Sequence, residues 1–128
     1  MGLGISIETV MRRPPVTALF SDNVSLVIEK MISNNIGAVI VMSGGNPVGI
    51  VTERDILERV VRAGKDPNKT RAEEIMSSPL ISIEADKTVK DALILMRDKK
   101  IRRLGVTRRE RLIGIVTERR LLDALASY

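Results

Sequence analysis

The chain has 128 residues, of which 44% are hydrophobic and 29% charged, and its formal net charge is +5. This length suits one compact domain and is too short for two independent ones. No apolar run approaches the roughly 20 residues that cross a bilayer, and the N-terminus lacks the apolar stretch of a signal peptide. We therefore expect a cytoplasmic protein with no membrane association.

The composition argues against an enzyme, because the chain contains neither Cys nor His. Their absence excludes disulfides, thiolate nucleophiles, imidazole bases and the usual zinc ligands. No cluster of Asp and Glu suggests another metal site, and no nucleophile–base pair can be named. We predict no catalytic residues and no metal, and a small enzyme is the least favoured class of function.

The first half of the chain alternates extended and helical patterns. A short extended segment at 16–17 follows Pro14-Pro15, which prevent a helix there. Asp22 or Asn23 can cap the helix that follows, and Asn34-Asn35 ends it. Residues 38–42 and 48–51 read as strands joined by a Gly-Gly turn, and a last helix begins at Thr52. The core-facing residues that we predict are Val24, Val27, Ile28 and Met31 in the first helix and Ile56, Leu57, Val60 and Val61 in the last.

The second half repeats the first. The segment GIVTER at 49–54 returns at 114–119, and the same offset of 65 residues aligns Met11 with Met76 and Pro14 with Pro79 without a gap. The chain is therefore a tandem of one supersecondary unit. We predict an α+β fold of two β-α-β-β-α repeats, 1–65 and 66–128, that pack with pseudo-two-fold symmetry into one compact module. The last helix of the second repeat is expected to bury Leu121, Leu122, Leu125 and Ala126.

The net charge is uneven along the sequence. Residues 1–65 hold 7 basic and 6 acidic residues, whereas residues 66–128 hold 14 and 10. Anionic partners are thus favoured over cationic ones, as either a small phosphate or a nucleic acid.

Four apolar residues lie off the core-facing stripes of the two corresponding helices: Leu26, Ile32, Ile94 and Leu95. Single exposed apolar side chains are common, so ordinary partial burial explains them as well as an interface does. Their place on corresponding helices favours a homodimer formed through these helices.

Thr52 and Asp55 have the spacing of a helix cap. Thr-x-x-Asp is a variant of the capping box, which stabilises a helix start without any ligand. A helix N-terminus also attracts anions, so the Thr52 hydroxyl and Arg54 can meet a phosphate while Asp55 accepts from a sugar diol.

Taken together, these motifs resemble a pair of CBS (cystathionine-β-synthase) domains, a Bateman module. The resemblance rests on M-x-x-P at 11–14 and 76–79, IGAVIV at 36–41, IRRLGV at 101–106 and the two GIVTER segments, and it covers nearly the whole chain. It implies clefts that bind adenosyl compounds, namely AMP, ADP, ATP or S-adenosylmethionine, with no cofactor required.

The resemblance also implies the residues of a first site. Thr52 meets a phosphate or ribose oxygen with Arg54 beside it, and Asp55 holds the ribose hydroxyls. The implied adenine cradle is Thr17 with the backbone of Gly37, Ala38 and Val39, since adenine needs flat apolar walls and a few edge hydrogen bonds.

The second copy departs from this pattern, because Arg120 stands where the first has Asp55 and an arginine offers no acceptor to a diol. Gly105 also replaces the proline of the family's pattern. We expect a weaker or phosphate-preferring second site, although Arg102 and Arg103 fit a solvated basic face equally well. The residues of this second cleft are Ser82, Arg102, Arg103, Leu104, Thr117, Arg119 and Arg120.

The function that follows is an adenine-nucleotide sensor that changes conformation on binding and regulates a partner protein that remains to be identified. The alternative is a nucleic-acid-binding protein that uses the basic stretches of the second repeat. It is disfavoured because the chain has one Phe, one Tyr and no Trp for base stacking, and because it shows no helix-turn-helix or zinc-finger spacing.

Overall fold

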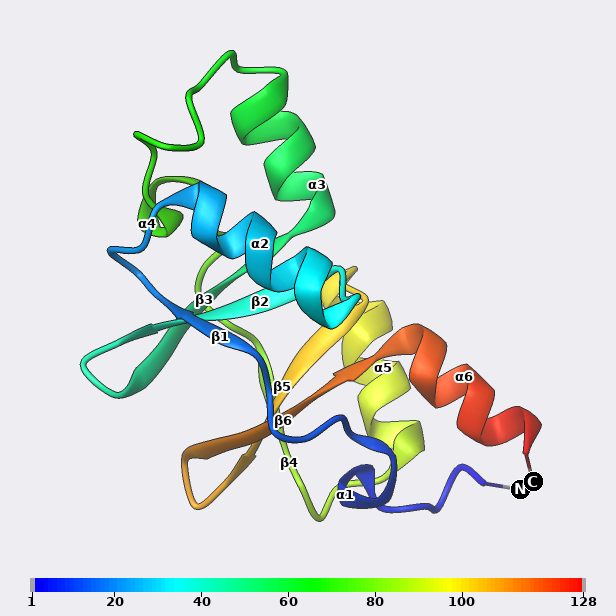
Figure 1. Cartoon of the computed structure of the whole chain (residues 1–128). Coiled ribbons are helices and arrows are strands. Elements are labelled where there is room, and N and C mark those ends of the chain that lie inside the picture. Colours follow the sequence, from blue (N-terminus) through cyan, green and yellow to red (C-terminus); the bar gives the residue numbers. More distant parts are fainter. Residues whose placement is uncertain (1, 128) are drawn as a thin grey trace. The chain divides into compact units, whose positions relative to one another are not determined.

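A computed structural model describes residues 2–127 and divides the chain into two compact units (Figure 1). The central unit is Val16–Leu80, and the terminal unit combines the segments 2–15 and 81–127. Each unit contains one three-stranded sheet and its own hydrophobic core.

The sheet of the central unit has the order β1-β2-β3. β1 runs parallel to β2, and β2 runs antiparallel to β3, with Ala38 opposite Thr52. A π-helical turn, η1, continues α3. The elements are β1 (Thr17–Leu19), α2 (Val24–Asn34), β2 (Ala38–Ser43), β3 (Asn46–Thr52), α3 (Glu53–Ile56), η1 (Leu57–Val61) and α4 (Ala72–Ile75).

The terminal unit repeats this arrangement with its sheet in the order β4-β5-β6. Again the first pair of strands is parallel and the second antiparallel, with Arg103 opposite Thr117. The elements are α1 (Ile7–Val10), β4 (Ser82–Glu84), α5 (Val89–Lys99), β5 (Arg103–Arg108), β6 (Arg111–Thr117) and α6 (Glu118–Ala126). The predicted β-α-β-β-α order is confirmed in both copies.

The short helices α1 and α4 are absent from our sequence prediction. Each has four residues, which is too short for a helical period to be visible in the sequence. Each buries two side chains, Ile7 with Val10 and Ala72 with Ile75, so each contributes a small apolar plug to its core.

The segment that precedes each sheet joins the unit built from the other copy's strands. The backbone of Arg12 pairs with Ile115 on β6, and that of Ser77 pairs with Ile50 on β3. The compact units therefore divide the chain at 15/16 and 80/81, whereas the sequence repeats are 1–65 and 66–128.

The repeated Gly and Met residues are explained by these pairings. A Cβ atom on Gly49 would lie 2.7 Å from the sulfur of Met76, and one on Gly114 would lie 2.7 Å from the sulfur of Met11. Only glycine leaves room for the segment that pairs with the strand. The methionine of each M-x-x-P motif therefore packs against the glycine of a GIVTER motif.

The core stripe predicted for the first helix is confirmed at Val24, Val27 and Met31, which are buried. The prediction for the last helix was partly wrong, because Leu57 is 62% and Val61 is 66% exposed. Ile56 and Val60, four residues apart, occupy the narrow face that covers the core, and a residue one position further points about 100° away.

The same correction holds for α6. Leu121 is buried, but Leu122 and Ala126 are exposed and Leu125 is half-buried. Within the described residues, no helix is both long and apolar enough to cross a membrane.

The β2–β3 and β5–β6 hairpin turns both use left-handed φ angles but have different residues. Gly44 and Gly45 join β2 to β3 with φ of 57° and 81°, and Arg109 and Glu110 join β5 to β6 with φ of 51° and 68°. Left-handed conformations suit glycine and cost energy in other residues, so the second turn holds two unfavourable positions.

Candidate functional site

The predicted residues of the first site gather at one end of the central sheet. We call this the helix end, where β3 runs into α3, and its counterpart in the terminal unit is where β6 runs into α6. Because β1 and β2 both start near this end and β3 finishes there, Thr17, Ala38 and Thr52 lie on neighbouring strands. Gly37 joins them, since its carbonyl accepts from the N–H of Glu53 at 3.1 Å.

Thr52 and Asp55 form the capping box that the spacing predicts. The Asp55 N–H donates to the Thr52 hydroxyl at 3.3 Å, and the Thr52 N–H donates to Asp55 Oδ2 at 2.9 Å. The Thr52 hydroxyl also donates to Asp55 Oδ2 at 3.1 Å. The single hydroxyl proton of Thr52 is thus directed to the carboxylate.

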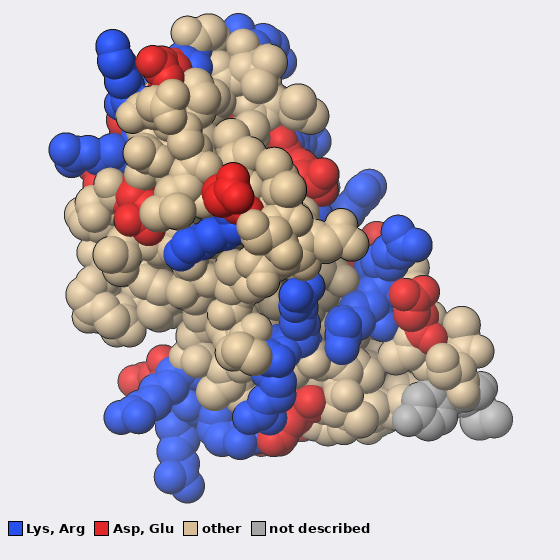
Figure 2. All heavy atoms as spheres, in the orientation of Figure 1, with Lys and Arg blue, Asp and Glu red and all other residues tan. Residues whose placement is uncertain are grey.

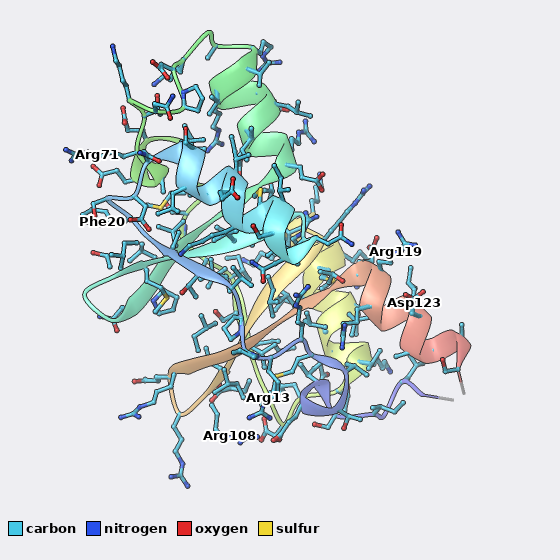
Figure 3. All side chains as sticks on the ribbon, in the orientation of Figure 1. Arg13, Phe20, Arg71, Arg108, Arg119 and Asp123 are labelled. Carbon is cyan, nitrogen blue, oxygen red and sulfur yellow. The ribbon has the colours of Figure 1, made fainter. Side chains whose placement is uncertain are left out.

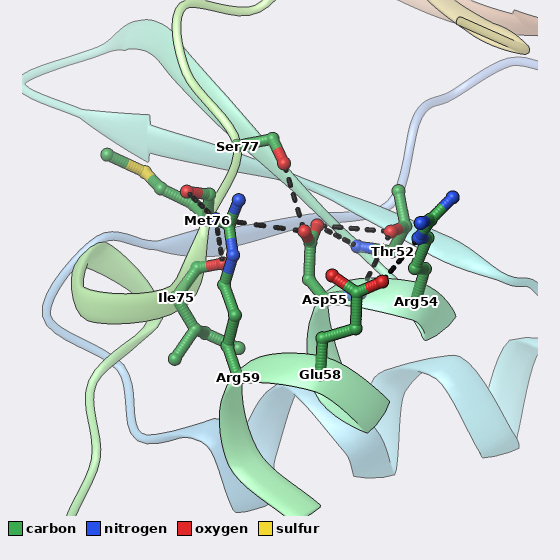
Figure 4. Close-up of polar contacts among 8 residues, drawn as sticks. All are labelled: Thr52, Arg54, Asp55, Glu58, Arg59, Ile75, Met76 and Ser77. Atoms are coloured by element: carbon green, nitrogen blue, oxygen red, sulfur yellow. Dashed lines mark hydrogen bonds and ion pairs between the residues drawn. The ribbon is translucent and has the colours of Figure 1, made fainter. Parts of the chain in front are cut away.

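The other carboxylate oxygen of Asp55 is bound from the segment that follows α4 (Figure 4). Ser77 Oγ donates to Asp55 Oδ1 at 2.9 Å, and Arg59 Nη1 lies 3.8 Å from the same oxygen. Arg59 also donates to the carbonyls of Ile75 at 3.0 Å and Met76 at 2.9 Å. Asp55 is only 6% exposed, so this network satisfies a buried charge and ties the start of α3 to the chain near residue 77.

Arg54 points outward from the same helix turn. Its side chain is 84% exposed, and its Nε donates to Glu58 at 2.6 Å. This hydrogen bond raises the pKa of Arg54 and lowers the pKa of Glu58. An exposed pair of this kind contributes little to stability, so Arg54 can leave Glu58 for a ligand at small cost.

The predicted adenine cradle lies where β2 extends past the paired part of β1. The N–H of Ile40 donates to the Val16 carbonyl at 3.2 Å, so alternation along the strand directs the N–H of Ala38 to the same side. Among the described residues, Ala38 has no backbone partner on that side. Val39 is fully buried and faces the core.

Three residues of this region were not predicted from the sequence. Ser77 and Arg59 bind Asp55, and Lys30 donates to the carbonyl of Thr17 at 2.6 Å. A signal existed for Ser77, which directly follows Met76 of the repeated M-x-x-P motif. Nothing in the local pattern connects it with a residue 22 positions earlier.

The terminal unit brings the predicted residues of the second cleft to the equivalent helix end. Arg103 lies opposite Thr117, Leu104 opposite Val116, and Ser82 opposite Gly105. The N–H of Glu118 donates to the Arg102 carbonyl at 2.9 Å, which repeats the bond between Glu53 and Gly37.

Arg120 cannot complete a capping box. Thr117 still accepts from the N–H of Arg120 at 3.1 Å, but the Arg120 side chain turns to the carbonyl of Val10, which its Nε contacts. Arg119, next to it, is exposed. The described residues include no group of three or more acidic side chains placed to hold a metal ion.

This duplicated fold, with a capped carboxylate at one helix end and arginines at the other, defines a class of paired domains. A family model described as the CBS domain matches residues 7–62 and 72–127, and the chain belongs to this family. The fold is that of a CBS domain pair.

Known proteins extend the comparison. Protein MK0525 of Methanopyrus kandleri is 39% identical over 121 residues, which is 93% of this chain and 62% of that protein. The chain thus spans less than two thirds of that relative. A structure of a protein with CBS domains from Burkholderia ambifaria superposes with a TM-score of 0.88 at 28% identity, covering 96% of this chain and 95% of that one.

A further similar structure contains bound adenosyl compounds. The CBS domain pair of protein MJ0100, in complex with 5′-methylthioadenosine and S-adenosyl-L-methionine, superposes with a TM-score of 0.83 at 25% identity. The match covers 96% of this chain and 97% of that chain.

Proposed function

We propose that the helix end of the central unit binds the adenosine part of an adenosyl ligand, namely AMP, ADP, ATP or S-adenosylmethionine. The observation that carries the proposal is the buried carboxylate of Asp55, which lies among hydroxyl donors at this end of the sheet. The ligands of the MJ0100 pair, both of them adenosyl compounds, support the choice of ligand class.

The geometry suggests how a ribose enters. One hydroxyl, that of Ser77, already donates to Asp55 Oδ1, so a ribose hydroxyl can replace it without leaving the charge unpaired. The N–H of Ala38, which has no backbone partner on this side among the described residues, can donate to the edge of an adenine. Arg54 is exposed and can turn from Glu58 to a phosphate.

The same exchange gives a route to regulation. When a ligand hydroxyl takes the place of Ser77, the segment Ile75 to Ser77 loses its tie to the start of α3 and keeps its bonds to Arg59, to β3 and to the carbonyl of Ala72. We infer that this segment moves on binding, and that the movement is what a regulated partner protein detects. The module itself carries out no catalysis in this proposal.

We also propose a homodimer that forms through α2 and η1 of the central unit. Ile32 on α2 is 71% exposed, and Leu57 and Val61 on η1 are also exposed. An open groove of about 520 Å³ runs along these helices, and exposed apolar surface of this kind is typical of interfaces. It is lined by Ile28, Met31, Ile32, Asn35, Ile36, Gly37, Glu53, Ile56 and Leu57.

Isothermal titration calorimetry with AMP, ATP and S-adenosylmethionine tests the ligand. Asp55→Ala should weaken binding by about 10- to 100-fold, because a hydrogen bond to a charged group contributes roughly 1.5–3 kcal/mol. Asp91→Ala is the matched control, since Asp91 closes the same kind of capping box on α5. Ser77→Ala should leave affinity unchanged or raise it, because it removes the competing hydroxyl.

The proposal fails if no adenosyl compound binds, or if the Asp55 and Asp91 variants lose affinity equally. A large loss in Ser77→Ala would show that Ser77 holds the ligand, which contradicts the exchange described above.

A further inference from the structure

The net charge of the protein resides in one compact unit. The terminal unit holds 14 basic and 8 acidic residues, a net charge of +6, and the central unit holds 7 and 8, a net charge of −1. This division is sharper than that of the sequence halves, because the segment 2–15 brings Arg12 and Arg13 to the terminal unit. In Figure 2, Lys and Arg spheres gather over the β5–β6 hairpin and the start of α6.

Much of the difference arises at four equivalent positions. Arg12, Arg102, Arg103 and Arg120 are the arginine cluster of the terminal unit, and their counterparts 65 positions away are Ser77, Gly37, Ala38 and Asp55. These four positions carry a charge of −1 in the central unit and +4 in the terminal unit. Arg119, which projects from the beginning of α6 in Figure 3, adds a further charge beside them.

Two of these positions are in contact in the central unit. Ser77 Oγ lies 2.9 Å from Asp55 Oδ1, and the backbone pairings of Ser77 with Ile50 and Arg12 with Ile115 are equivalent. In the terminal unit this hydroxyl–carboxylate pair is replaced by the two guanidinium groups of Arg12 and Arg120. Two like charges at such positions repel each other unless an anion lies between them.

One of the two guanidinium groups is already held in place. Arg120 Nε contacts the carbonyl of Val10, which is the counterpart of the Ile75 carbonyl that Arg59 binds. The residue equivalent to Arg59 is Ala124, whose side chain cannot donate to this carbonyl. Arg120 binds the carbonyl in its place, from a position four residues earlier in the helix. The anchor uses Nε and leaves the two terminal nitrogens of Arg120 for another acceptor.

Among the described residues, no acidic side chain forms an ion pair with the cluster. Of the ion pairs found between described residues, none involves Arg12, Arg102, Arg103 or Arg120. In contrast, Arg54 and Arg59 of the central helix end each have a carboxylate partner.

We propose that the terminal unit binds a condensed phosphate group, such as a diphosphate or triphosphate, between Arg12 and Arg120 with Arg102 and Arg103 beside them. One guanidinium group can donate two parallel hydrogen bonds to a phosphate. A condensed phosphate carries negative charges on adjacent phosphate groups, so it can bind several arginines at once. The side chains of the cluster itself offer no acceptor to a ribose diol. The inference rests on the proposed function only in taking the helix end as the ligand-binding end of a unit.

Calorimetry with inorganic triphosphate, which has no nucleoside, tests this site directly. We expect saturable binding that Arg103→Ala/Arg120→Ala weakens by about 100-fold or more and Arg12→Ala by about tenfold or more, since each lost charged hydrogen bond is worth about tenfold. The matched control is Arg109→Ala/Arg111→Ala, which removes the same charge from the β5–β6 hairpin of the same unit and should change the affinity less than threefold, roughly the effect of long-range charge alone. Circular dichroism confirms that each variant is folded.

The outcomes separate this inference from the proposed function. Triphosphate binding that survives Asp55→Ala supports it, even where no adenosyl compound binds to the central unit. Absence of triphosphate binding, or an equal loss in the hairpin control, overturns it while adenosine binding at Asp55 can still stand. It is also overturned if a short single-stranded DNA binds through the cluster and hairpin arginines alike and displaces triphosphate, because the unit would then be a nucleic-acid surface.

Discussion

Removing the carboxylate of Asp55 should destabilise the protein far more than removing a carboxylate from an ordinary helix cap. Asp55→Ala deletes the acceptor of the Thr52 N–H, which costs about 1 kcal/mol as in other caps. It also leaves the half-buried hydroxyls of Ser77 and Thr52 without their acceptor, which costs about a further 1–3 kcal/mol. The half-exposed contact with Arg59 adds little. We expect a total loss of about 3 kcal/mol.

Urea denaturation followed by circular dichroism measures this free energy of unfolding. Asp91→Ala provides the comparison, because its exposed capping box on α5 should cost only about 0.5–1 kcal/mol. Asp55→Asn should lose roughly 1 kcal/mol, since its amide oxygen can still cap Thr52 while its NH₂ group donates to Ser77 Oγ. Equal losses for Asp55→Ala and Asp91→Ala would refute the view that the Ser77 network stabilises the fold.

Three further predictions concern stability. Gly49→Ala and Gly114→Ala should each lower the free energy of unfolding by about 2 kcal/mol. The reason is that a Cβ atom at either site would lie 2.7 Å from a methionine sulfur and 2.8 Å from a carbonyl oxygen. Unequal losses would contradict the equivalent packing of the two motifs. Glu110→Gly should raise the melting temperature, with a gain of about 0.5–1 kcal/mol, because it relieves a φ of 68°, and a fall would show that Glu110 makes a contact of its own. The hydrogen bond from Arg108 lowers the pKa of Glu8, so this pair stabilises the fold above the ordinary glutamate pKa of 4.5, and its contribution disappears as the pH falls through the lowered pKa. The free energies of unfolding of Glu8→Gln and the wild type should therefore differ at pH 7 and agree in acid. A difference that does not change with pH would contradict the ion pair.

Local patterns in the sequence predicted the elements well because those elements depend on local physics. The helical spacing of Val24, Val27 and Met31 and the Thr52–Asp55 cap each need only a few neighbouring residues, and both are found in the structure. The direction of Leu57 and Val61 could not be predicted, because the sequence does not say how wide a face of the last helix the core covers.

The candidate site was predictable only in part for a similar reason. Thr17, Ala38 and Thr52 meet at one helix end because strand order and direction bring them together, and this grouping was predictable only through the resemblance to CBS domains. Ser77 reaches Asp55 by way of a pairing with β3 that no periodic pattern encodes. The replacement of this pair by Arg12 and Arg120 is visible in the sequence only after the 65-residue offset is applied to both members.

The crossing of the leading segments also sets the order in which the protein can fold during synthesis. Everything that the central unit needs has left the ribosome once Leu80 is exposed, and domains generally fold as units in the order in which they emerge. The backbone partners of Ile5, Ile7 and Glu8 lie between Ala85 and Val89, and that of Arg12 is Ile115, about a hundred positions later. The nascent chain therefore carries an unpaired, arginine-bearing arm until after the last residue of the central unit has been made.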